Sequence, residues 1–175
     1  NSLRDAYAFR QHVEAGRKNR GLEMIPEYDE FPVFYFSNHN SITGPGIVNV
    51  YKEHLEGLDF ELEIAVIIGK KGLNIKASDA HEYIFGYTIM NDWSARGLQM
   101  KEMKLNLGPA KGKDFATSIG PYITLQSDLN KYKVNEDGFS KYDIPLIASV
   151  NGTKVSEDNF KNMTWSFSEI IERAS

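Results

Sequence analysis

The chain has 175 residues, of which 41% are hydrophobic and 25% charged, and it contains no cysteine. This composition fits one globular domain with a sizeable core, and it excludes a disulfide framework and a thiolate nucleophile. The formal net charge of −4 and the pI near 5.6 offer no basic surface, so no nucleic-acid partner is expected. No apolar run reaches the length of a membrane span, and the lack of cysteine suits a reducing interior. We therefore expect a cytoplasmic protein with no membrane partner.

Short strands and short helices alternate along the sequence. In chain order, the hydrophobic pattern predicts a helix at Asp5–Lys18, strands at Val33–Phe36, Ile47–Tyr51, Phe60–Ile68 and Ile84–Met90, a helix at Asp92–Met103, strands at Pro121–Leu125 and Pro145–Val150, and a final helix from Phe167 to Ala174. The pair Asn151-Gly152 follows the last strand and predicts a tight hairpin turn of type I′. This order of elements indicates a mainly-β or α+β fold with short helices.

Two glutamates stand two residues apart in the apolar run from Phe60 to Ile68. Successive side chains of a strand point to opposite faces, so Glu61 and Glu63 share one face with their Cα atoms about 6.6 Å apart. Like charges at this spacing repel each other and lose hydration unless a positive charge lies between them. The pair therefore indicates either a divalent-cation site or, as in most such alternations, the solvated face of a half-exposed sheet.

Polar side chains follow the strand that ends near Met90. On the helix predicted after it, Asp92, Arg96 and Gln99 fall at i, i+4 and i+7 and form one stripe with an anion, a cation and an amide. Such a stripe at a strand end is typical of a functional site. Taken alone, it is more typical of an N-capping aspartate followed by an ordinary solvated face.

The loop Gly108-Pro-Ala-Lys-Gly-Lys-Asp-Phe115 carries two lysines. It is not a Walker A motif, because only three residues separate its glycines and Asp114 takes the place of the required Ser or Thr. A lysine in this loop is either a site cation or, more commonly, a solvated side chain. Among the four histidines, His12 carries the most weight because it lies beside Glu14, whereas His54 and His81 lie among surface-type residues and receive no role.

Three segments in this order resemble the fumarylacetoacetate hydrolase family: Asp59–Lys70, Gly86–Arg96 and Gly108–Pro121. The resemblance covers nearly the whole chain and implies the mixed β-sandwich roll of the C-terminal domain of that family, usually as a homodimer. Residues 1–175 would then form a single catalytic domain of this type. We expect this domain to be incomplete at both ends, because the chain begins at Asn1 without Met and stops at Ser175 inside a helical pattern.

The resemblance also implies a set of site residues. It implies a Mg²⁺ ion, with Ca²⁺ or Mn²⁺ as alternatives, held by Glu61, Glu63 and Asp92. Lys113 is similar to the family lysine that stabilises developing enolate or oxyanion charge. Arg96 and Gln99 are similar to the pair that orients the substrate.

His12 resembles the family histidine that activates water on a mobile helix. Some small members carry a glutamate three residues after that histidine, but position 15 here is Ala15, so Glu14 would have to swing round to serve. Ser37 stands where several members have a substrate-facing lysine, and Met103 stands where some have tyrosine. These departures bear on the choice of substrate.

The activity implied is Mg²⁺-dependent hydrolysis of a C–C bond in a 2,4-dioxo acid of the fumarylacetoacetate or acylpyruvate type, with water activated by His12. The same scaffold in this family also decarboxylates, isomerises or dehydrates oxo acids of aromatic catabolism. A metal-stabilised dimeric module without turnover is the non-enzymatic alternative.

Overall fold

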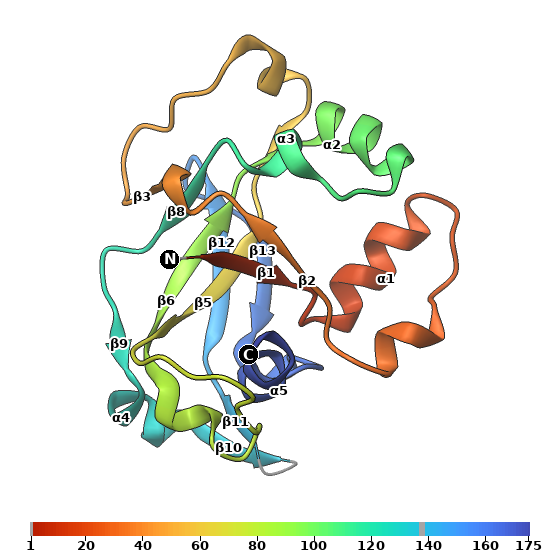
Figure 1. The fold of residues 1–175 in the computed structure, drawn as a ribbon. Helices are drawn as coiled ribbons and strands as arrows, with labels where there is room; N and C mark the ends of the chain where they lie inside the picture. The colour runs from red at the N-terminus through yellow and green to blue at the C-terminus, as the bar shows by residue number, and fades with distance from the viewer. Residues whose placement is uncertain (1, 137–138) are drawn as a thin grey trace. The chain divides into compact units, whose positions relative to one another are not determined.

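The computed structural model describes residues 2–136 and 139–175 (Figure 1). The chain divides into two compact units. The first unit consists of the segment up to Asp5 together with Tyr35–Ala65 and Tyr87–Ile123. The second unit consists of Ala6–Phe34, Val66–Gly86 and Thr124–Ser175. Strands β5 (Leu62–Ile68) and β6 (Ile84–Asp92) each contribute residues to both units.

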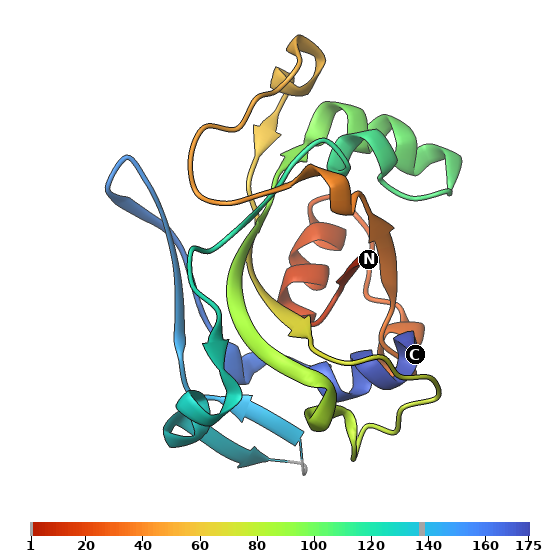
Figure 2. The ribbon, with the colours of Figure 1, turned by 60° about the vertical axis from the view of Figure 1, so that its left-hand side comes forward.

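The principal sheet has five strands. Its order is β3 (Ile42–Thr43), β8 (Thr117–Ile119), β6 and β5, and β9 (Thr124–Leu125) also pairs with β6. Strand β8 runs parallel to β3 and antiparallel to β6, so that Asp92 lies opposite Thr117. Strand β6 is the longest strand of this sheet and curves along its length (Figure 2). Its last residue, Asp92, is therefore held by a long paired strand.

Four further pairs of strands complete the β structure among the described residues. They are β1 (Leu3–Ala6) with β2 (Phe34–Ser37), β4 (Leu58–Asp59) with β7 (Ser94–Ala95), β10 (Lys133–Glu136) with β11 (Phe139–Tyr142), and β12 (Pro145–Val150) with β13 (Thr153–Asn159). Between β12 and β13, Asn151 and Gly152 have φ angles of +50° and +81°. Positive φ at both central residues is the requirement of a type I′ turn, so the predicted hairpin is confirmed.

The helices are short. They are α1 (Arg10–Lys18), α2 (Arg96–Glu102), α3 (Ala110–Lys113), α4 (Gln126–Leu129) and α5 (Phe167–Ala174). Helix α5 begins with a capping box, in which Glu169 accepts from the backbone N–H of Ser166 at 2.8 Å and returns its own N–H to the Ser166 hydroxyl. Within the second unit, Ile171 of α5 packs in one apolar cluster with Ile75 and Ala80. The predicted C-terminal helix is thus confirmed.

Single-turn 3₁₀ helices connect many of these elements: Pro26–Asp29, His39–Ser41, Lys52–Leu55, Ala80–Tyr83, Met103–Leu105, Asn130–Tyr132 and Phe160–Asn162. The expected strand-rich α+β class with short helices is confirmed. Over residues 2–136 and 139–175, every helix falls short of the length and apolar character that a membrane crossing needs.

Three predicted elements differ from the structure. Residues 47–51 form no strand, because the segment leaves Ile47 and Tyr51 90% and 75% exposed, with no sheet face to cover them. The first helix begins only at Arg10, because residues 3–6 pair with β2 instead. The helix expected from Asp92 begins at Arg96, because Asp92 ends β6 and the next residues pair with β4. Asp92 is therefore not a helix N-cap.

Candidate metal centre

Three carboxyl groups from three different strands converge in the first unit. Asp5 comes from β1, Glu63 from β5 and Asp92 from β6, and one ligand oxygen of each lies within 4.8 Å of the other two. Asp5 and Asp92 are only 7% and 2% exposed, and Glu63 is partly buried. Carboxylate oxygens are the hard donors that Mg²⁺, Mn²⁺ and Ca²⁺ prefer. These three residues form an acidic cluster with the chemistry and the spacing to hold a metal ion.

Burial and mutual repulsion oppose the ionisation of these carboxyl groups. Burial raises the pKa of Asp5 to about 7, and the charges of Asp92 and Glu61 add to the effect. Burial also raises the pKa of Glu63 well above its ordinary value, with further contributions from Asp5 and Glu61. The pKa of Asp92 is raised by burial as well, although Lys113 opposes the change. A bound cation would favour the ionised forms, because an opposite charge within a few ångströms stabilises them.

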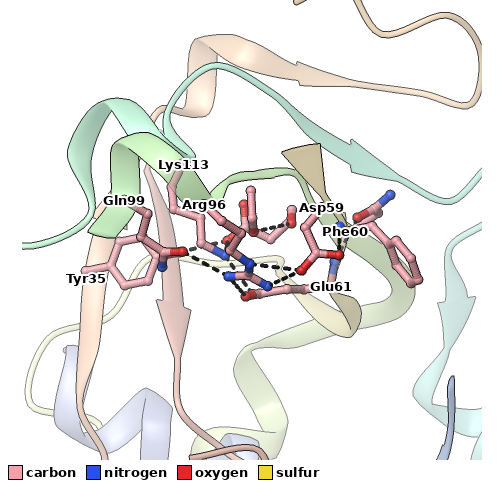
Figure 3. Close-up of polar contacts among 10 residues, drawn as sticks. Tyr35, Asp59, Phe60, Glu61, Arg96, Gln99 and Lys113 are labelled. Atoms are coloured by element: carbon pink, nitrogen blue, oxygen red, sulfur yellow. Dashed lines mark hydrogen bonds and ion pairs between the residues drawn. The ribbon is translucent and has the colours of Figure 1, made fainter. Parts of the chain in front are cut away.

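Glu61 stands beside this group and pairs with cationic side chains. Its Oε2 lies 2.7 Å from Nζ of Lys113, and its Oε1 lies 2.9 Å from Nη1 of Arg96 (Figure 3). Burial by itself would raise the pKa of Glu61, but Lys113 and Arg96 outweigh it and lower the pKa to about 2. The backbone N–H of Glu61 also donates to Oδ1 of Asn91 at 3.2 Å. Glu61 is therefore ionised in its ion pairs, and its role as a metal ligand stays a prediction.

Lys113 is a buried cation and not a solvated one. Its side chain lies at the end of α3, is almost fully enclosed, and places Nζ 2.7 Å from Glu61 and 2.8 Å from Oδ2 of Asp92. Burial would lower the pKa of Lys113, but the charges of Glu61 and Asp92 outweigh it and raise that pKa. The ammonium group therefore keeps its charge between the two carboxylates.

Contacts between α2 and α3 fix the backbone that carries Lys113. The two carboxylate oxygens of Glu102 each accept one backbone N–H, from Lys111 and from Gly112, both at 2.9 Å. At Gly112, a Cβ atom would lie 2.8 Å from the backbone N and Cα of Gln99, a distance that real side chains do not tolerate. A glycine at this position thus allows the close approach of α3 to α2 that brings Lys113 to the carboxylates.

Arg96 and Gln99 lie one helical turn apart at the start of α2. Nη1 of Arg96 donates to Oε1 of Gln99 at 2.9 Å, and its Nε donates to Oδ2 of Asp59 at 2.9 Å. The pairing of β4 with β7 places Asp59 opposite Ser94, two residues before Arg96, which explains the second contact. The guanidinium group is therefore held by Asp59, Glu61 and Gln99, as the labelled side chains in Figure 3 show.

Tyr35 completes the polar contacts of Asp92. Its hydroxyl, on strand β2, donates to Oδ2 of Asp92 at 2.8 Å. Burial, followed by the charges of Asp5 and Asp92, raises the pKa of Tyr35 above its ordinary value, so the hydroxyl stays protonated and remains a donor. The other oxygen of Asp92, Oδ1, is buried and has no hydrogen-bond partner among the described residues.

His12 and Glu14 belong to the second unit, where both are exposed on α1. The His12 ring lies 6.3 Å from the ring of Tyr7, measured between centroids. The Glu14 carboxylate is held by Nε of Arg10 at 2.8 Å, one helical turn earlier. The structure thus pairs Glu14 with Arg10, and the catalytic roles of His12 and Glu14 stay predictions.

Asp5 and Tyr35 are the site residues that the sequence pattern did not single out. Asp5 lies in a strand of four residues, too short for its alternation to stand out, and the sequence pattern predicts a helix start at this position instead. Tyr35 lies in the predicted aromatic strand, where its hydroxyl was the only signal that distinguished it from Phe34 and Phe36.

Comparisons with known proteins identify the family and the fold. The sequence model of the fumarylacetoacetate (FAA) hydrolase C-terminal domain matches residues 2–175. The chain is 33% identical over 161 residues to the oxaloacetate tautomerase YisK of Bacillus subtilis, covering 90% of this chain and 50% of that protein. It is 34% identical over 200 residues to the fumarylacetoacetase of Mus musculus, covering 92% and 48%. The chain belongs to the fumarylacetoacetate hydrolase family.

A solved structure has a similar fold. The 5-carboxymethyl-2-hydroxymuconate delta-isomerase of Mycobacterium smegmatis is similar with a TM-score of 0.67 and 28% identity, covering 82% of this chain and 52% of that one. The relatives named here are thus enzymes of more than one reaction type. The chain spans about half the length of the curated relatives it matches.

Proposed function

We propose that the chain belongs to an enzyme that acts on a small oxo acid held at a divalent cation, with Mg²⁺ as the first candidate and Mn²⁺ or Ca²⁺ as alternatives. The preferred reaction is hydrolysis of a C–C bond in a 2,4-dioxo acid of the fumarylacetoacetate or acylpyruvate type. The observation that carries this proposal is the convergence of Asp5, Glu63 and Asp92, which leaves Oδ1 of Asp92 buried without a partner among the described residues. Hard oxygen donors that repel one another fit a hard cation.

When bound, the cation would bind the carboxylate and 2-oxo groups of the substrate and would act as a Lewis acid. Hydrolysis adds the hydroxyl of water to the distal carbonyl carbon and leaves the electrons of the broken C–C bond on the pyruvate part, which then takes up a proton. Lys113 offers a fixed positive charge for the negative charge that develops on that part. Arg96 and Gln99, already held in one orientation, can position the substrate carboxylate.

We assign the activation of water to His12, since a neutral imidazole can accept the proton that the attacking water loses. Glu14 could support His12 only by leaving Arg10, to which it is bonded. This assignment separates the hydrolase from reactions that merely move a proton on the substrate.

Tautomerisation or isomerisation of an oxo acid is the second candidate reaction, and decarboxylation is a related one. The likeness to the oxaloacetate tautomerase supports this candidate. None of these reactions needs an activated water, so each could proceed without His12. A homodimer that merely binds a structural ion would leave the enclosed Lys113 without a chemical role.

The deciding experiment treats the full chain with EDTA, restores Mg²⁺, Mn²⁺ or Ca²⁺, and offers a panel of 2,4-dioxo acids and oxaloacetate. Hydrolysis releases pyruvate and a second carboxylic acid, decarboxylation releases CO₂, and tautomerisation changes only the enol absorbance. We expect metal-dependent hydrolysis that Asp92→Asn abolishes and that Asp128→Asn, at an exposed carboxyl group, leaves intact. Turnover that persists in EDTA, or that survives Asp92→Asn, would contradict the proposal.

A further inference from the structure

We propose that Tyr35 is a positioning residue that makes Asp92 a one-oxygen metal ligand and thereby favours Mg²⁺ or Mn²⁺ over the larger Ca²⁺. The inference rests on the proposed metal site and concerns how that site selects its ion. It starts from an asymmetry between the two oxygens of one buried carboxylate.

The first oxygen of Asp92, Oδ2, is fully engaged. It accepts hydrogen bonds from the Tyr35 hydroxyl on β2 and from the Lys113 ammonium group on α3, both at 2.8 Å. Both hydrogen bonds are strong, because the acceptor oxygen is charged and buried. A cation that approached Oδ2 would have to displace one of them or lie beside the positive charge of Lys113.

The second oxygen, Oδ1, has no hydrogen-bond donor among the described residues. It is nevertheless buried, and Asp92 is only 2% exposed. A buried carboxylate oxygen without a partner is costly, so such atoms in native proteins usually meet a water or an ion. Asp5 and Glu63 converge on the same carboxyl group. Oδ1 is therefore the atom that Asp92 offers to the cation.

A one-oxygen carboxylate ligand suits small cations better than large ones. Mg²⁺ takes about six ligands at about 2.1 Å in a strict octahedron, whereas Ca²⁺ takes about six to eight at about 2.3–2.6 Å and readily uses both oxygens of a carboxylate. Blocking Oδ2 denies Ca²⁺ that second contact. Removing the Tyr35 hydroxyl frees a lone pair on Oδ2 and lets the carboxylate turn.

The test measures the affinity of Mg²⁺, Mn²⁺ and Ca²⁺ by titration calorimetry on the EDTA-treated full chain and on Tyr35→Phe. We expect Tyr35→Phe to weaken Mg²⁺ and Mn²⁺ about 10- to 100-fold, as is usual for a lost hydrogen bond to a ligand, and Ca²⁺ by less than about threefold. Tyr122→Phe removes the same hydroxyl from a tyrosine that is 81% exposed, and it should change none of the affinities. Equal losses for all three ions, or no loss, would overturn the inference.

A second measurement does not depend on how the variant folds. In a crystal structure of the wild-type chain loaded with Mn²⁺, Asp92 should contact the ion through Oδ1 alone while Tyr35 stays bonded to Oδ2. Coordination through Oδ2 or through both oxygens would overturn the inference. If the wild-type chain binds none of the ions, the proposed metal site fails together with the inference; if it binds them with unchanged preference in Tyr35→Phe, only the inference fails.

Discussion

Replacing Asp5 by asparagine should stabilise the metal-free protein, although it removes a residue of the candidate site. Folding carries the pKa of Asp5 from 3.8 to about 7, because burial and the neighbouring carboxylates oppose its charge. At about 1.4 kcal/mol per pH unit, this change corresponds to roughly 4 kcal/mol of folding stability lost once Asp5 is ionised in both states. Asparagine has the same size and never ionises, so the variant escapes this loss.

The direction of the Asp5 pKa shift determines the pH range in which Asp5→Asn stabilises the protein. Below about pH 4, Asp5 is protonated in both the folded and the unfolded chain, so the carboxyl group contributes no difference. Between about pH 4 and 7 the unfolded chain ionises first, which favours unfolding of the wild type. Above about pH 7 the loss is complete. The advantage of Asp5→Asn should therefore grow from near zero to roughly 4 kcal/mol across this window.

Urea unfolding in EDTA, followed by tryptophan fluorescence at several pH values, measures this difference. Added Mg²⁺ should stabilise the wild type in proportion to the logarithm of its concentration and should stabilise Asp5→Asn far less, since the variant has lost a ligand. An exposed aspartate, as in Asp128→Asn, gives the matched control. A variant that is less stable than the wild type in EDTA at about pH 8 would refute the reasoning about an uncompensated acidic cluster.

Three further substitutions test neighbouring parts of the site. Lys113→Met should destabilise the chain by about 3–5 kcal/mol in EDTA, because it leaves the buried Asp92 without its cation and leaves Glu61 with Arg96 alone, and a loss below about 1 kcal/mol would contradict the ion pairs. Glu102→Ala should speed hydrogen exchange at the Gly112 amide about 10- to 100-fold, which corresponds to the loss of a hydrogen bond to a charged acceptor, whereas the exposed Glu53→Ala should not. His12→Ala should slow hydrolysis by about 10² or more with unchanged Mg²⁺ affinity. An unchanged rate would remove His12 from the mechanism and favour tautomerisation or decarboxylation.

Local signals predicted the elements that local chemistry determines. The Asn151-Gly152 turn follows from the positive φ that these two residue types accept, and the helix at Phe167–Ala174 follows from its apolar spacing. The strand predicted at Ile84–Met90 ends within two residues of the observed end at Asp92. In each case neighbouring residues suffice to choose the conformation.

The acidic cluster depends on contacts that no local pattern encodes. Asp5 becomes a site residue only because β1 pairs with β2, some thirty residues away in sequence, and this pairing overrides the helix expected from Asp5. Residues 47–51 show the converse. Their alternating pattern predicts a strand, but they pair with no strand among the described residues, and Ile47 stays exposed. Propensity is a weak prior where pairing decides the outcome.

The charges of the first unit explain why two glutamates on one strand face can behave differently. Among the described residues, five carboxyl groups (Asp5, Asp59, Glu61, Glu63 and Asp92) meet two cationic side chains (Lys113 and Arg96), so three negative charges are unbalanced when all are ionised. Both cations contact Glu61, which lowers its pKa, while Glu63 contacts neither in these ion pairs and keeps a raised pKa. A divalent cation would leave one unbalanced charge. The same cation would favour the ionised forms of Asp5 and Glu63, the carboxyl groups whose pKa burial raises most clearly.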